Sequence, residues 1–384
     1  MNSIIVIGIA HHNTYGVIRA LAQKVLKDKI VLIIIGEKTN FVAQTSLVNK
    51  HNIYHVQDNQ AAYDLLLSSF TNIEYKSTII CCSDSSIAYL DSKRDSLKDY
   101  FYLPNANAIE GRIAELMNKS LQREYAKKCG LILPEGMVIH NLDDVRLWQT
   151  FPCIIKPQSS ICGTKSDIHI CKTKKELLDY FSYSNIKPTQ IETFIIKKKE
   201  FQLIGCSLDS GETIIIPGYT DIIRQPANTN TGFLEYKPLD FNVSETTLTR
   251  TKEFIKSIGY SGLFSVEFIK DNDDRDYFME INMRNDGNAI CVTASGVNLP
   301  YIWYAHNSNI DISEESAKIP NKVVVMPEFD DFVFVLKGKL SLWKWIKDVK
   351  RTDCFMEYES CDKSPFFYKL RDFLKFLLKR TFRI

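Results

Sequence analysis

The first quarter of the chain alternates between continuous apolar runs and stretches of helical periodicity. Three apolar runs have the length and composition of buried parallel strands and span residues 4–7, 30–35 and 78–82. Apolar positions recur at helical spacing within residues 15–28 and 61–70. Strands that alternate with helices predict a parallel sheet with right-handed crossovers. We therefore expect residues 1–105 to form a small Rossmann-like domain.

The turn after the first apolar run does not have the spacing of a dinucleotide-binding loop. It reads Gly8-Ile-Ala-His-His-Asn-Thr-Tyr-Gly16, which is not GxGxxG. No acidic residue closes the next predicted strand in the expected place. We therefore interpret Gly8 and Gly16 as turn glycines and expect no NAD site.

The pattern becomes a mixture of short strands and helices after Pro104. A long helical stretch covers residues 109–129. The later predicted elements are a strand–helix–strand–loop–strand region at 137–171, a helix at 174–183, a strand-rich region at 191–216, a helix at 246–258 and strands at 264–269 and 277–281. This mixture predicts an α+β region of two lobes, residues 106–190 and 191–310, and a C-terminal extension, 311–384.

Composition is that of a globular protein with more than one packed unit. The chain has 384 residues, of which 45% are hydrophobic and 24% are charged. Its 48 basic and 46 acidic residues give a net charge of +2. This balance provides no electrostatic argument for nucleic acid, and we expect no such partner.

The N-terminal sequence and the cysteines favour a cytoplasmic protein. The first residues show no basic region and no cleavage site, and the apolar run at 4–7 is too short to span a bilayer. The ten cysteines are then expected to be mostly reduced thiols. They form no pair of CxxC motifs, so we expect no zinc site.

Two acidic residues stand inside apolar runs that flank a polar turn. The turn, Asp271 to Asp276, predicts a hairpin in which Glu267 lies opposite Glu280. A strand period of two places Asn282 on the face of Glu280, and Arg284 follows if the strand continues. Side-by-side carboxylates with an amide oxygen suit magnesium. The alternative is that both glutamates are solvated strand positions.

A lysine ends another apolar run, Phe151 to Lys156. A lysine that closes a buried strand needs an anionic partner, and a phosphate would serve. The small, polar segment that follows, residues 158–166, contains Lys165 and could fold over a nucleotide's phosphates. It has a single glycine, and the alternative for Lys156 is a surface position at a strand end.

Taken in order, these motifs resemble those of the ATP-grasp superfamily over about residues 1–305. The motifs are Lys119 on a helix, Ile155-Lys156-Pro157, Ile191-Glu-Thr-Phe-Ile195, Glu200, Glu267 and Glu280-x-Asn282-x-Arg284. The chain looks most like the carbamoyl-phosphate-synthase-like group that includes D-aspartate ligases. That likeness rests on Val17 to Leu21, Ser83-Asp84, Arg94 to Leu97 and Arg224-Gln-Pro226. The resemblance implies a Rossmann-like domain followed by a two-lobed ATP-grasp domain.

The resemblance also implies a nucleotide site. Lys119, Lys156 and Lys165 would contact the phosphates of ATP. Glu200 would hold the ribose hydroxyls. The backbone of a hinge would read adenine, and its residues are Glu192, Thr193, Phe194 and Ile195.

The same resemblance implies the metal ligands and the catalytic residues. Glu267, Glu280 and Asn282 would hold Mg²⁺, with two ions expected. Arg284 and Arg224 would face an acyl-phosphate. The implied enzyme is a ligase that activates a carboxylate with ATP and transfers the acyl group to an amine, both being small molecules. An amino acid joined to a cell-envelope or polysaccharide precursor is the implied reaction.

Three other functions stay open. Carboxylases and dipeptide synthetases share the same superfamily motifs. The loop at 158–166 lacks the usual cluster of glycines, which leaves a nucleotide-binding scaffold without turnover as another reading. The acidic pair and Arg284 argue against such a scaffold.

The C-terminal tail combines an apolar stripe with basic charge. Phe366, Leu370, Phe373, Leu374 and Leu377 recur at helical spacing, and the tail after Lys363 has six Lys or Arg and one Asp. A basic amphipathic helix can lie on an anionic membrane surface. The tail therefore predicts either peripheral contact with the inner membrane face or a helix packed on the body.

Overall fold

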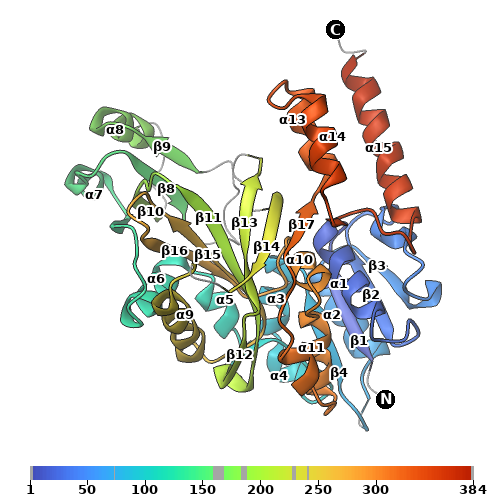
Figure 1. Ribbon diagram of the computed structural model, residues 1–384. Coiled ribbons are helices and arrows are strands. Elements are labelled where there is room, and N and C mark those ends of the chain that lie inside the picture. Colours follow the sequence, from blue (N-terminus) through green and yellow to red (C-terminus); the bar gives the residue numbers. More distant parts are fainter. Residues whose placement is uncertain are drawn as a thin grey trace.

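The computed structural model describes residues 3–72, 74–158, 168–182, 188–226, 231–239 and 242–381. Within these residues the chain forms three β-sheets with helices around them (Figure 1). The sheets have five, four and nine strands. The fold is the expected combination of a parallel α/β unit and an antiparallel α+β region.

The first sheet is parallel throughout, in the order β3-β2-β1-β4-β5. Its strands are β1 (Ile4–Gly8), β2 (Ile30–Ile35), β3 (Ile53–Val56), β4 (Ser77–Cys81) and β5 (Phe101–Tyr102). The helices of this part are α1 (His12–Ala22), α2 (Asn59–Ser69), α3 (Asp84–Asp91) and α4 (Arg94–Leu97), with short 3₁₀ turns at Val42–Gln44 and Lys50–Asn52. The strand order reverses between β1 and β4, and ligands of parallel α/β sheets bind at such a switch point.

The two N-terminal glycines are not turn residues, which corrects the interpretation made from sequence. Gly16 lies inside α1, where a Cβ would meet the side chain of Ile290 at 3.4 Å. Gly8 ends β1, and a Cβ there would lie 2.2 Å from Oγ1 of Thr14. Gly8 therefore has no room for a Cβ, whereas a Cβ at Gly16 would only make an ordinary contact with Ile290.

The long helix predicted at 109–129 is two helices, α5 (Arg112–Leu116) and α6 (Lys119–Lys128). The break has a local cause. The Asn118 side chain accepts hydrogen bonds from the backbone amides of Ser120 and Leu121, which caps a new helix. This cap fixes the direction in which Lys119 leaves the backbone.

The four-stranded sheet forms a small lobe with its own apolar core, in the order β7-β10-β8-β9. Its elements are β7 (Gly136–Ile139), α7 (Leu142–Leu147), β8 (Cys153–Pro157), β9 (His169–Cys171), α8 (Lys174–Ser182) and β10 (Thr189–Thr193). In Figure 1 α7 and α8 lie at the far side of this lobe from the C-terminal helices.

The nine-stranded sheet is the largest part of the fold, in the order β16-β15-β11-β13-β14-β17-β18. Its strands include β11 (Lys199–Leu208), β13 (Gly218–Arg224), β14 (Phe233–Pro238), β15 (Tyr260–Lys270) and β16 (Asp276–Asn282). Two short strands pair at its side, β12 (Thr213–Ile215) with β11 and β6 (Asn105–Ala106) with β15. A 3₁₀ turn at Asp209–Gly211 and helix α9 (Glu245–Ser257) complete this region.

The C-terminal segment returns to this sheet. Its elements are α10 (Ile290–Ala294), α11 (Leu299–Asn307), α12 (Ser313–Ser316), β17 (Val323–Met326), α13 (Glu328–Leu336), α14 (Leu342–Lys350), β18 (Cys354–Phe355) and α15 (Ser364–Thr381). Strand β17 pairs with β14, and β18 pairs with β17. Helices α13, α14 and α15 project together from the body (Figure 1). No helix among the described residues is long and apolar enough to cross a membrane.

Candidate active site

Two glutamates face each other on the hairpin formed by β15 and β16. The register pairs Glu267 with Glu280, as the sequence predicts, and Ser265 with Asn282. The carboxylate of Asp271 organises the turn, because it accepts hydrogen bonds from the amides of Asp273 at 2.9 Å and Arg275 at 3.0 Å.

The predicted pairing is correct even though the turn sits half a residue from its predicted centre. Lys270 pairs with Asp276, so the turn is centred on Asp273. A bulge between Glu267 and Phe268 then adds one residue on the opposing strand and shifts the register. The shifted turn centre and the bulge compensate for each other, so Glu267 still lies opposite Glu280.

The side chains of this hairpin gather with a lysine from α6. Nδ2 of Asn282 donates to Oε1 of Glu267 at 2.7 Å, which confirms that the two share one face. Nζ of Lys119 lies 2.6 Å from Oε2 of Glu280. Burial alone would lower the pKa of Lys119, but Glu280, Glu267 and Glu192 together raise it. Lys119 is therefore a fixed cation beside the acidic pair.

The acidic pair carries more negative charge than its neighbours neutralise. Glu267 is 7% exposed, and its pKa is raised by burial first and then by the charges of Glu280, Asp286 and Glu200. A divalent cation would remove this repulsion, so the residues fit magnesium. Within the described ranges no group of three or more His, Cys, Asp or Glu is arranged to hold a metal. Magnesium here would thus rely on two carboxylates, the Asn282 oxygen and nucleotide phosphates.

Lys156 on β8 has an anionic partner within the protein. Its Nζ lies 2.8 Å from Oε2 of Glu192, while Nη1 of Arg123 lies 3.0 Å from Oε1 of the same carboxylate. Burial would raise the pKa of Glu192, but Lys156 and Arg123 lower it. The strand-end lysine is therefore satisfied without a ligand, and its contact with a phosphate stays a prediction.

The predicted adenine hinge follows β10 directly. The amide of Thr193 donates to the carbonyl of Glu135 at 2.8 Å, and that of Phe194 donates to the carbonyl of Pro152 at 2.9 Å. These bonds fix the backbone that leads to Ile195. Glu200 at the start of β11 accepts from Lys197 at 2.8 Å and from Gln225 at 3.0 Å. Contacts of these residues with adenine and ribose stay predictions.

The end of β8 meets the start of α6. The amide of Lys119 donates to the carbonyl of Gln158 at 2.9 Å, which ties the small lobe to the helix that carries the lysine. The predicted phosphate loop continues from Gln158, but residues 159–167, including Lys165, lie outside the described residues.

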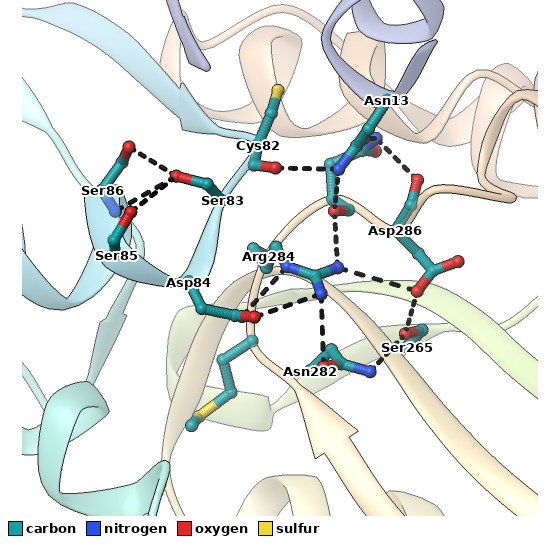
Figure 2. A network of polar contacts seen from close by, with 12 residues as sticks. Asn13, Cys82, Ser83, Asp84, Ser85, Ser86, Ser265, Asn282, Arg284 and Asp286 are labelled. Carbon is teal, nitrogen blue, oxygen red and sulfur yellow. Dashed lines mark hydrogen bonds and ion pairs between the residues drawn. The ribbon is translucent and has the colours of Figure 1, made fainter. Parts of the chain in front are cut away.

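Arg284 stands two residues beyond the end of β16 in a polar network (Figure 2). Its Nε lies 3.0 Å from Oδ1 of Asp84, its Nη1 lies 3.7 Å from Oδ2 of Asp286, and its Nη2 lies 3.4 Å from Oδ1 of Asn282. Burial would lower the pKa of Arg284, but Asp84 and Asp286 raise it. The arginine therefore links the metal-site face to the end of β4.

A cleft of about 530 Å³ opens at this arginine. Its wall comes from the segments between β1 and α1 and between β4 and α3 with the first residues of those helices, from residues between β13 and β14, from the loop after β16 and from α13. The polar or charged residues of the wall include His11, His12, Asn13, Asp84, Arg284, Asp286 and Asp330. The cleft thus lies at the switch point of the parallel sheet, where α/β folds bind ligands. Burial, with His12 and Lys369, lowers the pKa of His11 to about 3, so this imidazole is neutral.

Arg224 forms ion pairs with the C-terminal helices. Its guanidinium forms two 2.8 Å hydrogen bonds with Asp331 of α13 and one of 3.0 Å with Asp348 of α14. The structure therefore brings Lys119, Glu267, Glu280, Asn282 and Arg284 together, whereas Arg224 anchors the C-terminal helices. A catalytic role for Arg224 stays a prediction.

Several residues of this region had no assigned role at the level of sequence. Arg123 stands one helical turn after Lys119, so its place beside Glu192 follows from the periodicity of α6. Asp84 comes two residues after the strand-like run at 78–82, and the carboxyl end of a parallel strand is where ligand-binding residues stand. His11 and His12 lie at the start of α1 and Asp286 lies in the loop after β16, and their approach depends on the tertiary fold.

The chain is similar to known ligases in sequence and in fold. No family model matches the chain. It is 28% identical over 295 residues to a D-alanine–D-alanine ligase from Helicobacter pylori (strain P12), covering 68% of this chain and 80% of that enzyme. It is 26% identical over 223 residues to the ligase of the same name from Helicobacter acinonychis (strain Sheeba), covering 52% of this chain and 62% of that enzyme.

Solved structures share the fold at low sequence identity. An N5-carboxyaminoimidazole ribonucleotide synthetase in complex with ADP superposes with a TM-score of 0.64 at 15% identity, covering 88% of this chain and 85% of that one. An L-amino acid ligase from Bacillus licheniformis superposes with a TM-score of 0.62 at 16% identity, covering 83% and 78%. The chain is thus similar in sequence to D-alanine–D-alanine ligases and in fold to ATP-dependent ligases, which agrees with the resemblance to the ATP-grasp superfamily and with a ligase that uses ATP and magnesium to form carbon–nitrogen bonds.

Proposed function

We propose that this chain is a carboxylate–amine ligase that joins an amino acid to an amine of a cell-envelope or polysaccharide precursor through an acyl-phosphate. The observation that carries the proposal is the position of Arg284. It contacts Asn282 on the acidic face and also lines the cleft of about 530 Å³. A nucleotide phosphate at Glu267 and Glu280 would thus lie next to a substrate in the cleft.

The chain's cations and carboxylates would position the nucleotide. Lys119 and Lys156 would approach the phosphates. Glu280 holds Lys119 in place by an ion pair of 2.6 Å, and Glu192 holds Lys156 by one of 2.8 Å. Magnesium bound at Glu267, Glu280 and Asn282 would neutralise charge on the transferred phosphoryl group. Phosphoryl transfer depends mainly on such positioning and neutralisation.

The charges of the cleft suit a substrate that carries both signs. Arg284 supplies a buried cation, and Asp84, Asp286 and Asp330 supply carboxylates. An amino acid has a carboxylate for the arginine and an ammonium group for an aspartate. Most of the sequence relatives are named D-alanine–D-alanine ligases, which agrees with an amino acid as substrate, and one is named biotin carboxylase.

The reaction balances without a nucleophile from the protein. An oxygen of the substrate carboxylate attacks the γ-phosphorus of ATP, which breaks its bond to the bridging oxygen and releases ADP. The amine then attacks the acyl carbon, the carbon–oxygen bond to phosphate breaks, and the amine loses a proton. Arg284 would stabilise the oxyanion formed in this second step.

The test is a coupling assay with the full chain. Mg-ATP is combined with a panel of amino acids as acids and with amino acids or amino sugars as amines, and ADP, phosphate and product mass are measured. We expect ADP release to require one acid and one amine. The product should have the summed mass of the two minus water.

Two results would overturn the proposal. ADP release that depends on bicarbonate, with a carboxylated product, would assign the chain to carboxylation. Binding of Mg-ATP without turnover across the panel would assign it to a nucleotide-binding scaffold. Replacing the assay's Mg²⁺ with EDTA should abolish turnover and serves as the background control.

A further inference from the structure

An apolar groove separates α15 from the pair formed by α13 and α14 (Figure 1). It has a volume of about 550 Å³, and its lining includes Phe332, Trp345, Val349, Phe366, Phe373 and Leu377. A groove lined by aromatic and aliphatic side chains is rare on the surface of a monomer unless something binds there.

Large apolar side chains continue from the groove onto the outer surface. Trp343 at the start of α14 is 77% exposed, and Leu378 near the end of α15 is 57% exposed. Leu342, Leu374 and Phe376 are exposed in the same two helices. Helix α14 begins at the tip of the projection and α15 runs toward that tip (Figure 1), so Leu342, Trp343 and Leu378 belong to the parts of these helices nearest the tip.

Exposed basic side chains run along the two helices that form this apolar end. Lys344, Lys347 and Lys350 are exposed on α14, and the one acid of that helix, Asp348, is buried against Arg224. Exposed Arg371, Lys375 and Lys379 follow on α15, which has a single exposed acid, Asp372, among its described residues. The whole chain has a net charge of only +2, so positive charge is concentrated here.

The base of the projection is fixed firmly to the body. The carboxylate of Glu328, at the start of α13, accepts hydrogen bonds from the amides of Met356, Glu357 and Tyr358. Asp362, just before α15, accepts from the amide of Ser46 at 2.9 Å. The apolar end is therefore presented in a defined direction.

We propose that this end, formed by α13, α14 and α15, docks on an anionic lipid bilayer, with the groove and its exposed apolar side chains inserted at the headgroup boundary. Tryptophan suits that depth because its ring is amphipathic. Peripheral binding requires apolar insertion together with basic charge, and both are present. A second copy of the chain fits less well, because two basic rims would face each other.

Docking would place the substrate cleft close to the membrane. Helix α13 contributes Asp330 and Val333 to the cleft, and Phe329 and Phe332 on the same helix line the groove. If the proposed ligase reaction is correct, an amine on a membrane-attached precursor would reach the cleft from this side. The docking itself does not depend on that reaction.

The test is flotation of the full chain with phosphatidylcholine vesicles that do or do not contain phosphatidylglycerol. We compare the wild type with a triple variant, Lys344→Gln, Lys347→Gln and Lys379→Gln. The control triple, Lys27→Gln, Lys127→Gln and Lys252→Gln, makes the same change in charge at exposed positions elsewhere. Each basic residue near an anionic surface contributes about fivefold to partitioning, so the first triple should bind about 100-fold more weakly and the control should bind nearly normally.

A second variant tests insertion. Trp343→Ser with Leu378→Ser changes two exposed side chains, so the fold should be retained. It should lose vesicle binding while its ATP turnover in solution stays at the wild-type level. Subtracting the emission spectrum of Trp343→Phe from that of the wild type gives the emission of Trp343. The maximum of this emission should shift to shorter wavelength when vesicles are added.

Three results would overturn the proposal. The first is absence of binding to phosphatidylglycerol vesicles by the wild type. The second is an equal loss of binding in both lysine triples. The third is a wild-type dimer in sedimentation analysis that Trp343→Ser with Leu378→Ser dissociates, which would assign the groove to a second copy. Because ATP turnover is measured separately, failure here is distinct from failure of the ligase proposal.

Discussion

Replacing Glu280 by glutamine separates catalysis from stability at this site. Glu280 faces Glu267 across the hairpin and lies 2.6 Å from Nζ of Lys119. The change removes one negative charge and alters the side-chain volume little. If Glu280 binds magnesium, ATP turnover should fall while the fold remains.

The structure allows both magnitudes to be worked out. Loss of the half-buried pair with Lys119 costs about 1–2 kcal/mol, between values for exposed and buried pairs. Relief of repulsion on the buried Glu267 acts in the opposite direction, so the free energy of unfolding should change by about 1 kcal/mol or less. A carboxylate beside a cation at about 4 Å contributes about 4 kcal/mol at an effective dielectric constant of about 20. Losing that contribution in the transition state lowers kcat by about 1000-fold.

The assay measures ADP by an enzyme-coupled reaction and Mn²⁺ binding by titration. The matched control is Asp276→Asn on the same strand, which loses a buried ion pair to Lys270 at 2.5 Å but lies four residues from Glu280. The control should lose stability and keep its ATP turnover. Glu280→Gln should keep its stability and lose its ATP turnover. Turnover by Glu280→Gln within about tenfold of wild type, with unchanged Mn²⁺ affinity, would refute the metal assignment.

Two further variants test other charges of the structure. Lys156→Met should raise the Kd of ATP at least about tenfold and lower the free energy of unfolding by about 1–3 kcal/mol, because Glu192 is left with Arg123 alone; an unchanged Kd by calorimetry would show that Lys156 contacts no phosphate. Burial raises the pKa of Asp91 to about 6. The folded protein therefore binds a proton at this carboxylate more tightly than the unfolded chain does, and the free energy of unfolding should rise as the pH falls through about 6. Asp91→Asn should remove that rise and raise the free energy of unfolding by about 1–3 kcal/mol at about pH 8, and an unchanged pH profile of thermal unfolding would contradict this.

The parallel sheet and the acidic pair could be predicted because both follow from local periodicity. Buried strands such as Ile4–Gly8 are continuous apolar runs, and a period of two along β16 puts Glu280 and Asn282 on one face. The turn was less predictable, because a bulge beside Glu267 shifts the register and no feature of the local periodicity indicates it. The break before Lys119 depends on a cap by Asn118, which a periodicity count over 109–129 does not detect.

The contacts that sequence could not reveal join segments far apart in the chain. Arg224 has its partners in Asp331 and Asp348, more than 100 positions later. Strand β17 extends the sheet beyond β14, and its four residues carry no sign of their partner. The cleft has the same property, because it forms only where loops after β1, β4 and β16 meet α13. Such pairings are set by tertiary packing.

The most direct test of the central claim follows an oxygen atom from the acid to phosphate. The acid identified in the coupling assay is labelled with ¹⁸O in its carboxylate and allowed to react with Mg-ATP and the amine. An acyl-phosphate route transfers one labelled oxygen to inorganic phosphate, because the acyl carbon–oxygen bond breaks when the amine attacks. We predict phosphate with one ¹⁸O and unlabelled ADP. Unlabelled phosphate, or label recovered in AMP, would contradict the account.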